Sequence, residues 1–182
     1  MFQETSDSFF ENIHTRLSSF KCQVAFIDGM HLFECALRDF INLTKISSDK
    51  ALFLFHDPIP WTFKMATRDN SKLAPNEAWT GDIWKLVHIF IEAGLKDSIS
   101  LLSSAPSGLL AVLNPGKEKV IELEKNYDEI CARWIDVNFN ETNLLDFYET
   151  GVFVKPEVFL RSLEKLSFAK KVLNKSKSWV SQ

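Results

Sequence analysis

The sequence predicts an α/β fold: a mostly parallel, Rossmann-like sheet with an antiparallel hairpin near its end, followed by a helical C-terminal tail. Two short apolar runs, Val24–Ile27 and Ala51–Phe55, flank a stretch of helical periodicity at Leu32–Ile46. Two strands joined by a helix of this length normally form a right-handed parallel crossover. Polar residues directly follow both strands, at the edge of the sheet where α/β proteins bind ligands.

Composition limits the classes of function. The chain has 182 residues, of which 46% are hydrophobic and 16 are phenylalanine, so a packed core is expected. The net charge of -3 provides no bulk attraction to nucleic acid or anionic lipid, and we expect neither as a partner. No apolar run approaches the roughly 20 residues that span a bilayer. Three cysteines without metal-ligand spacing indicate reduced thiols in a cytoplasmic protein.

The elements before the first crossover are short. Met1–Thr5 is typical of the end of a strand, and Asp7 is a plausible N-cap for a following helix. After the crossover helix, Ser47–Lys50 is expected to be a turn into the second strand. The first helix is predicted from apolar residues at helical spacing, namely Phe9, Phe10, Ile13 and Leu17.

The middle of the chain contains a long loop. Pro58–Asn76 has three prolines and no apolar period, and loops of this length in compact domains are usually functional or disordered. Thr80 or Asp82 is then expected to cap a helix that runs to about Ala93. Gly94 suits the C-terminal end of that helix.

The last part of the predicted sheet is a hairpin. Ser98–Ser103 and Leu109–Leu113 are strand-like and are separated by a short turn that contains proline and glycine. A single helix is expected at Lys117–Ile135. We therefore predict two units: residues 1–115 form the α/β domain, and residues 116–182 form a helical appendage.

Several segments resemble one enzyme family in the right order. Residues 26–34 read Phe-Ile-Asp-Gly-Met-His-Leu-Phe-Glu, and residues 37–40 read Leu-Arg-Asp-Phe. This is similar to the Asp-Gly-x-His segment of class I S-adenosylmethionine-dependent methyltransferases that act on small molecules. Residues 53–57, Phe-Leu-Phe-His-Asp, resemble the next strand of that family, and residues 79–86 and 105–109 are similar to later segments of a bacterial subgroup. The resemblance covers the C-terminal portion of the family's domain.

The resemblance implies O-methyl transfer from S-adenosylmethionine to a small hydroxylated substrate. In such a site His31 or His56 would be the catalytic base. Asp28 and Asp57 would orient the substrate, or would hold a divalent cation such as Mg²⁺, which prefers oxygen ligands. The residues alone also allow plainer roles, because an aspartate after a strand often caps the next helix. They equally allow His31 to be an ordinary histidine at a helix end.

The resemblance also implies where the cofactor binds. Asp28 and Gly29 would contact it, and Ser6 and Asp7 match a segment that contacts the adenine in the family. A simple helix N-cap is the alternative for Ser6 and Asp7.

The long loop corresponds to one that approaches the substrate in the family, so Trp61 and Arg68 are candidate substrate contacts. Packing of these side chains over the sheet is the alternative. Trp79 and Trp84, which follow the loop, are expected in the core.

One part of the family pattern has no counterpart. The family binds its cofactor with a glycine-rich turn and a ribose-binding acidic residue, whereas this chain has only six glycines and no Gly-x-Gly cluster. We therefore expect a truncated domain with an incomplete cofactor site. The alternative is a non-catalytic interaction module, or one piece of a split assembly, whose exposed sheet edge pairs with a separate N-terminal half or with itself. A hydroxylase-like relative of the same fold is a third hypothesis.

Overall fold

The structure is a computed structural model that describes residues 4–13 and 21–164. Most of the predicted strand end at Met1–Thr5 lies outside these ranges, as do Leu17 of the first predicted helix and the last part of the tail. The helices of the described regions are α1 (Ser6–Glu11), α3 (Phe33–Lys45), α4 (Lys85–Glu92), α5 (Lys117–Lys125), α6 (Tyr127–Trp134), α7 (Glu141–Tyr148) and α8 (Pro156–Glu164), with short 3-10 turns η1 (Asn70–Lys72) and η2 (Lys96–Ser98).

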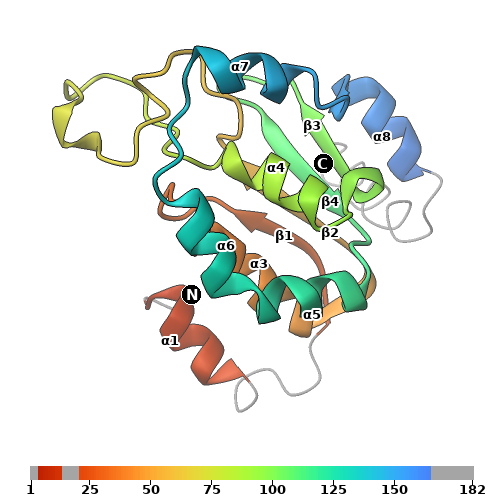
Figure 1. The fold of residues 1–182 in the computed structure, drawn as a ribbon. Coiled ribbons are helices and arrows are strands. Elements are labelled where there is room, and N and C mark those ends of the chain that lie inside the picture. Colours follow the sequence, from red (N-terminus) through yellow and green to blue (C-terminus); the bar gives the residue numbers. More distant parts are fainter. Residues whose placement is uncertain (1–3, 14–20, 165–182) are drawn as a thin grey trace, which may run out of the picture.

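The fold is α/β, with a five-stranded mixed sheet (Figure 1). Its strands are β1 (Cys22–Ile27), β2 (Ser47–His56), β3 (Ile99–Leu102), β4 (Leu109–Leu113) and β5 (Phe153–Val154), and they lie in the order β1-β2-β4-β3-β5. Strand β1 is parallel to β2, and β3 is parallel to β5, while β4 is antiparallel to both of its neighbours. Four strands therefore point the same way, and β4 alone is reversed. The predicted parallel crossover and the predicted hairpin are both confirmed.

Helix α3 joins β1 to β2 and covers one face of the sheet. Its apolar positions recur at helical spacing, so they form one buried stripe, while the charged side chains lie on the other side. The ring of Phe40 lies 5.0 Å from that of Phe53 on β2 and 5.1 Å from that of Phe90 on α4. The core of the domain therefore lies between β2 and these two helices. The buried stripe of α3 consists of Phe33, Ala36, Leu37, Phe40 and Ile41.

Several predicted boundaries are wrong. The turn expected at Ser47–Lys50 is the first part of β2, since Ser47 already pairs with Cys22 of β1. This part of the strand is mostly exposed, so it lacks the apolar run by which a buried strand is detected. The helix expected at Lys117–Ile135 is two helices, α5 and α6, which meet at Asn126. Strand β5 lies in the region that was expected to be entirely helical.

The expected helix caps are also wrong. Thr5, not Asp7, caps α1, because its side chain accepts a hydrogen bond from the Ser8 amide. Neither Thr80 nor Asp82 caps α4, which begins only at Lys85. The Asp82 side chain accepts a hydrogen bond from the Phe33 amide, and the Thr80 hydroxyl donates to the Met65 carbonyl. Both partners are distant in sequence, so a local pattern does not reveal them.

The helices after the hairpin share the hydrophobic core of the sheet. Side chains of α5, α6 and α7 pack in the same buried cluster as the strands and α3, and Figure 1 shows α4, α5 and α6 on the face that α3 covers. The opposite face has a smaller cluster in which Phe159 of α8 packs on Leu102 and Ala111. On β1, Val24 and Phe26 stay 45% and 57% exposed. In the described ranges, no helix has the length and apolar character needed to cross a membrane.

Candidate functional site

Two histidines and two aspartates meet where β1 and β2 end. Asp28 and His31 follow β1, and His56 and Asp57 end or follow β2. Because the two strands are parallel and Ile27 is paired with Phe55, both strands end at the same side of the sheet. The structure thus brings together the four side chains that the sequence suggested for catalysis and metal binding. We call Asp28, His31, His56 and Asp57 the His–Asp cluster.

His56 faces both carboxylates through one ring nitrogen. Its Nδ1 lies 3.3 Å from Asp28 Oδ1 and 3.1 Å from Asp57 Oδ1. A neutral ring with its proton on Nδ1 would suit these two acceptors and would leave Nε2 as an acceptor. No described residue hydrogen-bonds to Nε2, and the His56 side chain is 26% exposed.

His31 is held from both sides. Its Nδ1 lies 3.0 Å from the Trp79 carbonyl oxygen and 3.5 Å from Asp57 Oδ2, and its Nε2 lies 3.3 Å from Asp28 Oδ1. Every one of these partners is an oxygen, so both ring nitrogens of His31 face acceptors. His31 has no nitrogen left for a substrate, and its contacts suit a role in positioning the two carboxylates.

Trp79 is part of this site, whereas the sequence had suggested that it belongs to the core. Its ring stacks on that of His31 with 5.2 Å between centroids and 28° between planes. Its indole N–H donates to the Thr67 carbonyl at 2.6 Å, which fixes the ring. Trp84, by contrast, is 1% exposed, as predicted for a core residue.

Asp57 is buried in an uncommon backbone conformation. Its φ of 60° lies in the left-handed region, which aspartate tolerates better than most residues. The Ser107 hydroxyl, from the turn between β3 and β4, donates to Asp57 Oδ1. Such conformations are often kept at functional sites. No local signal in the sequence pointed to Ser107.

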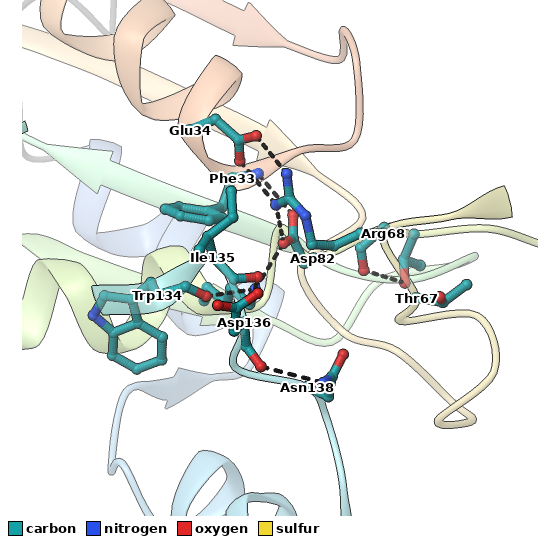
Figure 2. Close-up of polar contacts among 12 residues, drawn as sticks. Phe33, Glu34, Thr67, Arg68, Asp82, Trp134, Ile135, Asp136 and Asn138 are labelled. Carbon is teal, nitrogen blue, oxygen red and sulfur yellow. Dashed lines mark hydrogen bonds and ion pairs between the residues drawn. The ribbon is translucent and has the colours of Figure 1, made fainter. Parts of the chain in front are cut away.

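The contacts of Asp28 and Arg68 differ from the roles that the sequence suggested for them, which were a helix cap for Asp28 and a substrate contact or packing over the sheet for Arg68. The capping role weighed for Asp28 belongs to Asp82, whose Oδ1 accepts from the Phe33 amide at 2.8 Å at the start of α3. Arg68 donates to Glu34 at 2.5 and 2.9 Å and to Asp82 Oδ2 at 2.5 Å, as Figure 2 shows. Burial acts to raise the pKa of Glu34, but the hydrogen bonds and charge of Arg68 outweigh it and lower that pKa. Arg68 therefore ties the long loop to α3. Trp61 is 63% exposed on that loop.

A fully buried lysine completes the network around Asp82. Lys85 Nζ donates to Asp82 Oδ2 at 2.8 Å and to the Trp134 carbonyl at 2.8 Å, and it lies 4.9 Å from the centre of the Phe33 ring. Burial lowers the pKa of this amine, and the bond to Asp82 opposes that shift. The network joins the long loop, α3, α4 and the end of α6, so it supports the segment that carries Trp79 to His31.

A groove of about 380 Å³ lies beside the His–Asp cluster, between α1 and the end of β1. Of the residues expected to contact a cofactor, Ser6, Asp28 and Gly29 line this groove. Asp7 does not line it, and its carboxylate binds Arg38 at 2.7 and 2.9 Å. The full lining is Glu4, Ser6, Phe9, Phe10, Phe26, Ile27, Asp28, Gly29, Asp39 and Leu43.

The described residues offer no grouped set of metal ligands. Within residues 4–13 and 21–164, no three His, Cys, Asp or Glu side chains are grouped so that they could hold a metal ion. Asp28 and Asp57, which the resemblance suggested as ligands of Mg²⁺, have carboxylates that face imidazole nitrogens.

The groove has an acidic and aromatic lining. The described residues that line it include carboxylates and phenyl rings and no Lys, Arg or His, a composition that suits a cationic ligand with an aromatic ring. The described residues do not include the glycine-rich turn of the family.

Gly81 holds the backbone of His31, and its replacement by alanine is expected to destabilise the site. It has a φ of +57°, and an added Cβ would lie 1.7 Å from the His31 carbonyl oxygen. We expect Gly81→Ala to lower the free energy of unfolding by about 1–3 kcal/mol, because both the backbone conformation and the contact become strained. Urea unfolding followed by circular dichroism measures this change.

Gly29→Ala is the matched control for that experiment. A Cβ at Gly29 would meet nothing within 4 Å, so its stability should stay within about 0.5 kcal/mol of the parent protein. Equal losses in the two variants would contradict the close packing of Gly81 on His31.

No protein-family model, no curated protein and no solved structure matches this chain. Its function therefore has to be inferred from the chemistry of its own residues.

Proposed function

We propose that this protein transfers a methyl group from S-adenosylmethionine to a hydroxyl oxygen of a small molecule, with His56 as the base. The observation that carries the proposal is the His56 ring itself. Two carboxylates lie 3.1 and 3.3 Å from its Nδ1, no described residue hydrogen-bonds to its Nε2, and its neighbour Asp28 lines the groove. An imidazole held in this way is a common arrangement for a general base.

The chemistry assigned to each residue follows from these contacts. His56 Nε2 accepts the proton of the substrate hydroxyl as the oxygen forms its bond to carbon. Asp28 and Asp57 stabilise the imidazolium that results, and they keep the ring in the required tautomer. The cofactor, when bound, supplies the electrophilic methyl group. A base of this kind contributes roughly 10²- to 10⁴-fold to the rate.

The surroundings of His56 favour a substrate with an apolar part. The Phe26 ring lies 5.9 Å from the His56 ring and is 57% exposed. Met30, after β1, is 67% exposed. Exposed large apolar side chains beside a polar cluster are typical of a binding surface. We therefore propose a hydroxylated acceptor whose ring or chain packs on Phe26.

Two further features support the methyltransferase proposal. The motif residues at positions 26–34 and 53–57 resemble the family, and the sheet has four strands in one direction and one reversed strand, which belongs to the β3–β4 hairpin. The family sheet is likewise mostly parallel and ends in a reversed hairpin. The three free cysteines also fit the proposed cytoplasmic location, where thiols stay reduced.

A methyl-transfer assay tests the proposal. Purified protein is incubated with methyl-labelled S-adenosylmethionine and a panel of small phenols and sugars, and labelled products are separated by chromatography. We expect label on at least one acceptor oxygen, with a rate that depends on protein concentration. Absence of label from every acceptor, while the cofactor binds in a separate titration, would refute His56-assisted methyl transfer.

A second candidate, an interaction module, is favoured by the edge of the sheet. Strand β1 is the last in the strand order and pairs only with β2 among the described strands, and Val24 and Phe26 are exposed on it. An unprotected edge of this kind favours pairing with another strand, either of a separate N-terminal half or of a second copy. Light scattering compares the molecular mass of Val24→Lys with that of the parent protein. A parent protein that pairs with a second copy should have a larger mass than the variant, because a charge on an edge strand opposes pairing.

A further inference from the structure

We infer that His88 is a proton-sensitive latch, which holds α6 and α7 against α4 while its ring is neutral and releases them when the ring gains a proton. Among the described histidines, His88 is the one that lies outside the His–Asp cluster. The inference goes beyond the proposed function, because it concerns the packing of three helices and needs neither a cofactor nor a methyl acceptor.

The first support is the position of the His88 ring, which lies where the three helices meet. It faces the ring of Trp84, at the start of α4, edge-on with 5.8 Å between centroids. It stacks on the Trp134 ring of α6 with 5.7 Å between centroids and 20° between planes, and it lies 6.1 Å from the Phe147 ring of α7. His88 therefore contributes to the contacts of α4 with both other helices.

The second support is that this packing suits only a neutral ring. His88 Nε2 is buried, and no described residue hydrogen-bonds to it. The buried indole nitrogen of Trp84 also has no partner among the described residues, and it can only donate. A neutral imidazole can leave Nε2 as an unused acceptor, whereas an imidazolium carries an N–H on both nitrogens. Protonation would thus place a charge and an unsatisfied donor among aromatic rings, and attraction to the Trp134 face offsets only part of that cost.

The third support is the charged groups beside the ring. Glu92, one turn after His88 on α4, and Asp146 on α7 are the carboxylates that act on it. Glu92 Oε2 accepts from Arg133 of α6 at 2.7 Å and from the Trp134 indole N–H at 3.4 Å, so it ties α6 to α4. A protonated His88 would be attracted to Glu92 and would compete with both α6 groups for its carboxylate. The same proton that disfavours the aromatic packing would therefore also weaken this tie.

The direction of the pKa shift agrees with this packing. Burial lowers the pKa of His88, and the charges of Glu92 and Asp146 oppose that shift without cancelling it. An exposed ring has the ordinary pKa of 6.5, so a released form binds a proton more readily than the latched form. The latched form is therefore fully favoured above that pH. This preference is lost as the pH falls from there through the lowered pKa of His88.

The latch is connected to the His–Asp cluster through hydrogen bonds. The Trp134 carbonyl accepts from Lys85 Nζ, which also donates to Asp82. The Asp82 amide in turn donates to the His31 carbonyl at 3.1 Å. Release of Trp134 would remove an acceptor of the buried Lys85 and weaken the position of Asp82 against His31. Mild acid should therefore loosen the support of the His–Asp cluster.

Hydrogen exchange followed by mass spectrometry near pH 7.5 and near pH 5.5 tests the inference. After correction for the intrinsic pH dependence of exchange, peptides of α6 and α7 should exchange roughly three- to tenfold faster at the lower pH, and those of β2 and β4 should not. Residues 79–84 should follow α6. His88→Phe keeps an aromatic ring but binds no proton, so it should remove the response. His56→Gln is the matched control, because it removes a histidine outside the three helices and should retain the response of α6 and α7.

An NMR titration of the His88 ring in the parent protein gives a second readout that needs no variant, and its pKa should lie below the ordinary value. A pKa of His88 at or above that value, exchange in α6 and α7 that does not change with pH, the same change in His88→Phe, or an equal change in β2 and β4 would each overturn the latch. A response in α6 without one in residues 79–84 would overturn its link to the His–Asp cluster. None of these results depends on methyl transfer, so the latch and the proposed function can fail separately.

Discussion

Lys85→Met should lower the free energy of unfolding by about 3 kcal/mol, because the substitution breaks a buried ion pair and leaves its partner behind. Lys85 is 0% exposed, and its amine donates to Asp82 and to the Trp134 carbonyl. Methionine has a similar volume, so the loss would come mainly from the buried Asp82 carboxylate, which would keep Arg68 as a counter-ion but lose Lys85, and from the carbonyl left without a donor. Urea unfolding measured by circular dichroism at pH 7 gives the difference.

Two variants make this prediction specific. Lys45→Met removes an exposed lysine that pairs with Glu124 at 2.7 Å, and it should cost less than about 1 kcal/mol. Asp82→Asn combined with Lys85→Met should lose less than the sum of the single variants, because the two side chains interact directly. Strict additivity, or an equal loss in Lys45→Met, would contradict the role of the buried pair.

His56→Ala should reduce the rate of methyl transfer by roughly 10²- to 10⁴-fold, as expected for the loss of a general base. His31→Gln should have a smaller effect, because His31 has acceptor oxygens facing both ring nitrogens and only positions Asp28 and Asp57. The single-turnover rate with saturating cofactor measures both variants.

The order of these two effects is the informative result. A greater loss in His31→Gln than in His56→Ala, with both proteins shown to be folded by circular dichroism, would contradict the proposal that His56 is the base. Unchanged binding of the acceptor in His56→Ala would show that the histidine acts on the reaction and not on affinity.

The parts of the fold that depend on local apolar patterns could be predicted. Strand β1 is indicated by its continuous apolar run, and Phe40 belongs to a stripe at helical spacing on α3. The apolar run is typical of a strand buried on both faces, and that expectation is wrong for β1, because Val24 and Phe26 are exposed. Burial of one face of a helix imposes the helical spacing on the sequence, so the spacing reveals the helix. The close approach of Asp28 and His56 also followed, because parallel strands end at the same edge.

The residues that complete the site could not be predicted in this way. Trp79 reaches His31 across 48 positions of the chain, and Ser107 reaches Asp57 across 50. Asp82 caps α3 rather than the helix next to it. A hydrogen bond between such distant positions leaves no periodic trace, and each of these side chains had a plausible local role.

By itself, the sequence determined the crossover of β1, α3 and β2, the hairpin of β3 and β4, and which polar residues stand at the ends of β1 and β2. It did so because burial and backbone geometry act on neighbours along the chain. Only the tertiary structure decided that both ring nitrogens of His31 face protein oxygens, that Arg68 serves the scaffold, and that β5 joins the sheet. Those properties depend on what surrounds a side chain in space, and the surrounding atoms come from segments that lie far apart in the chain.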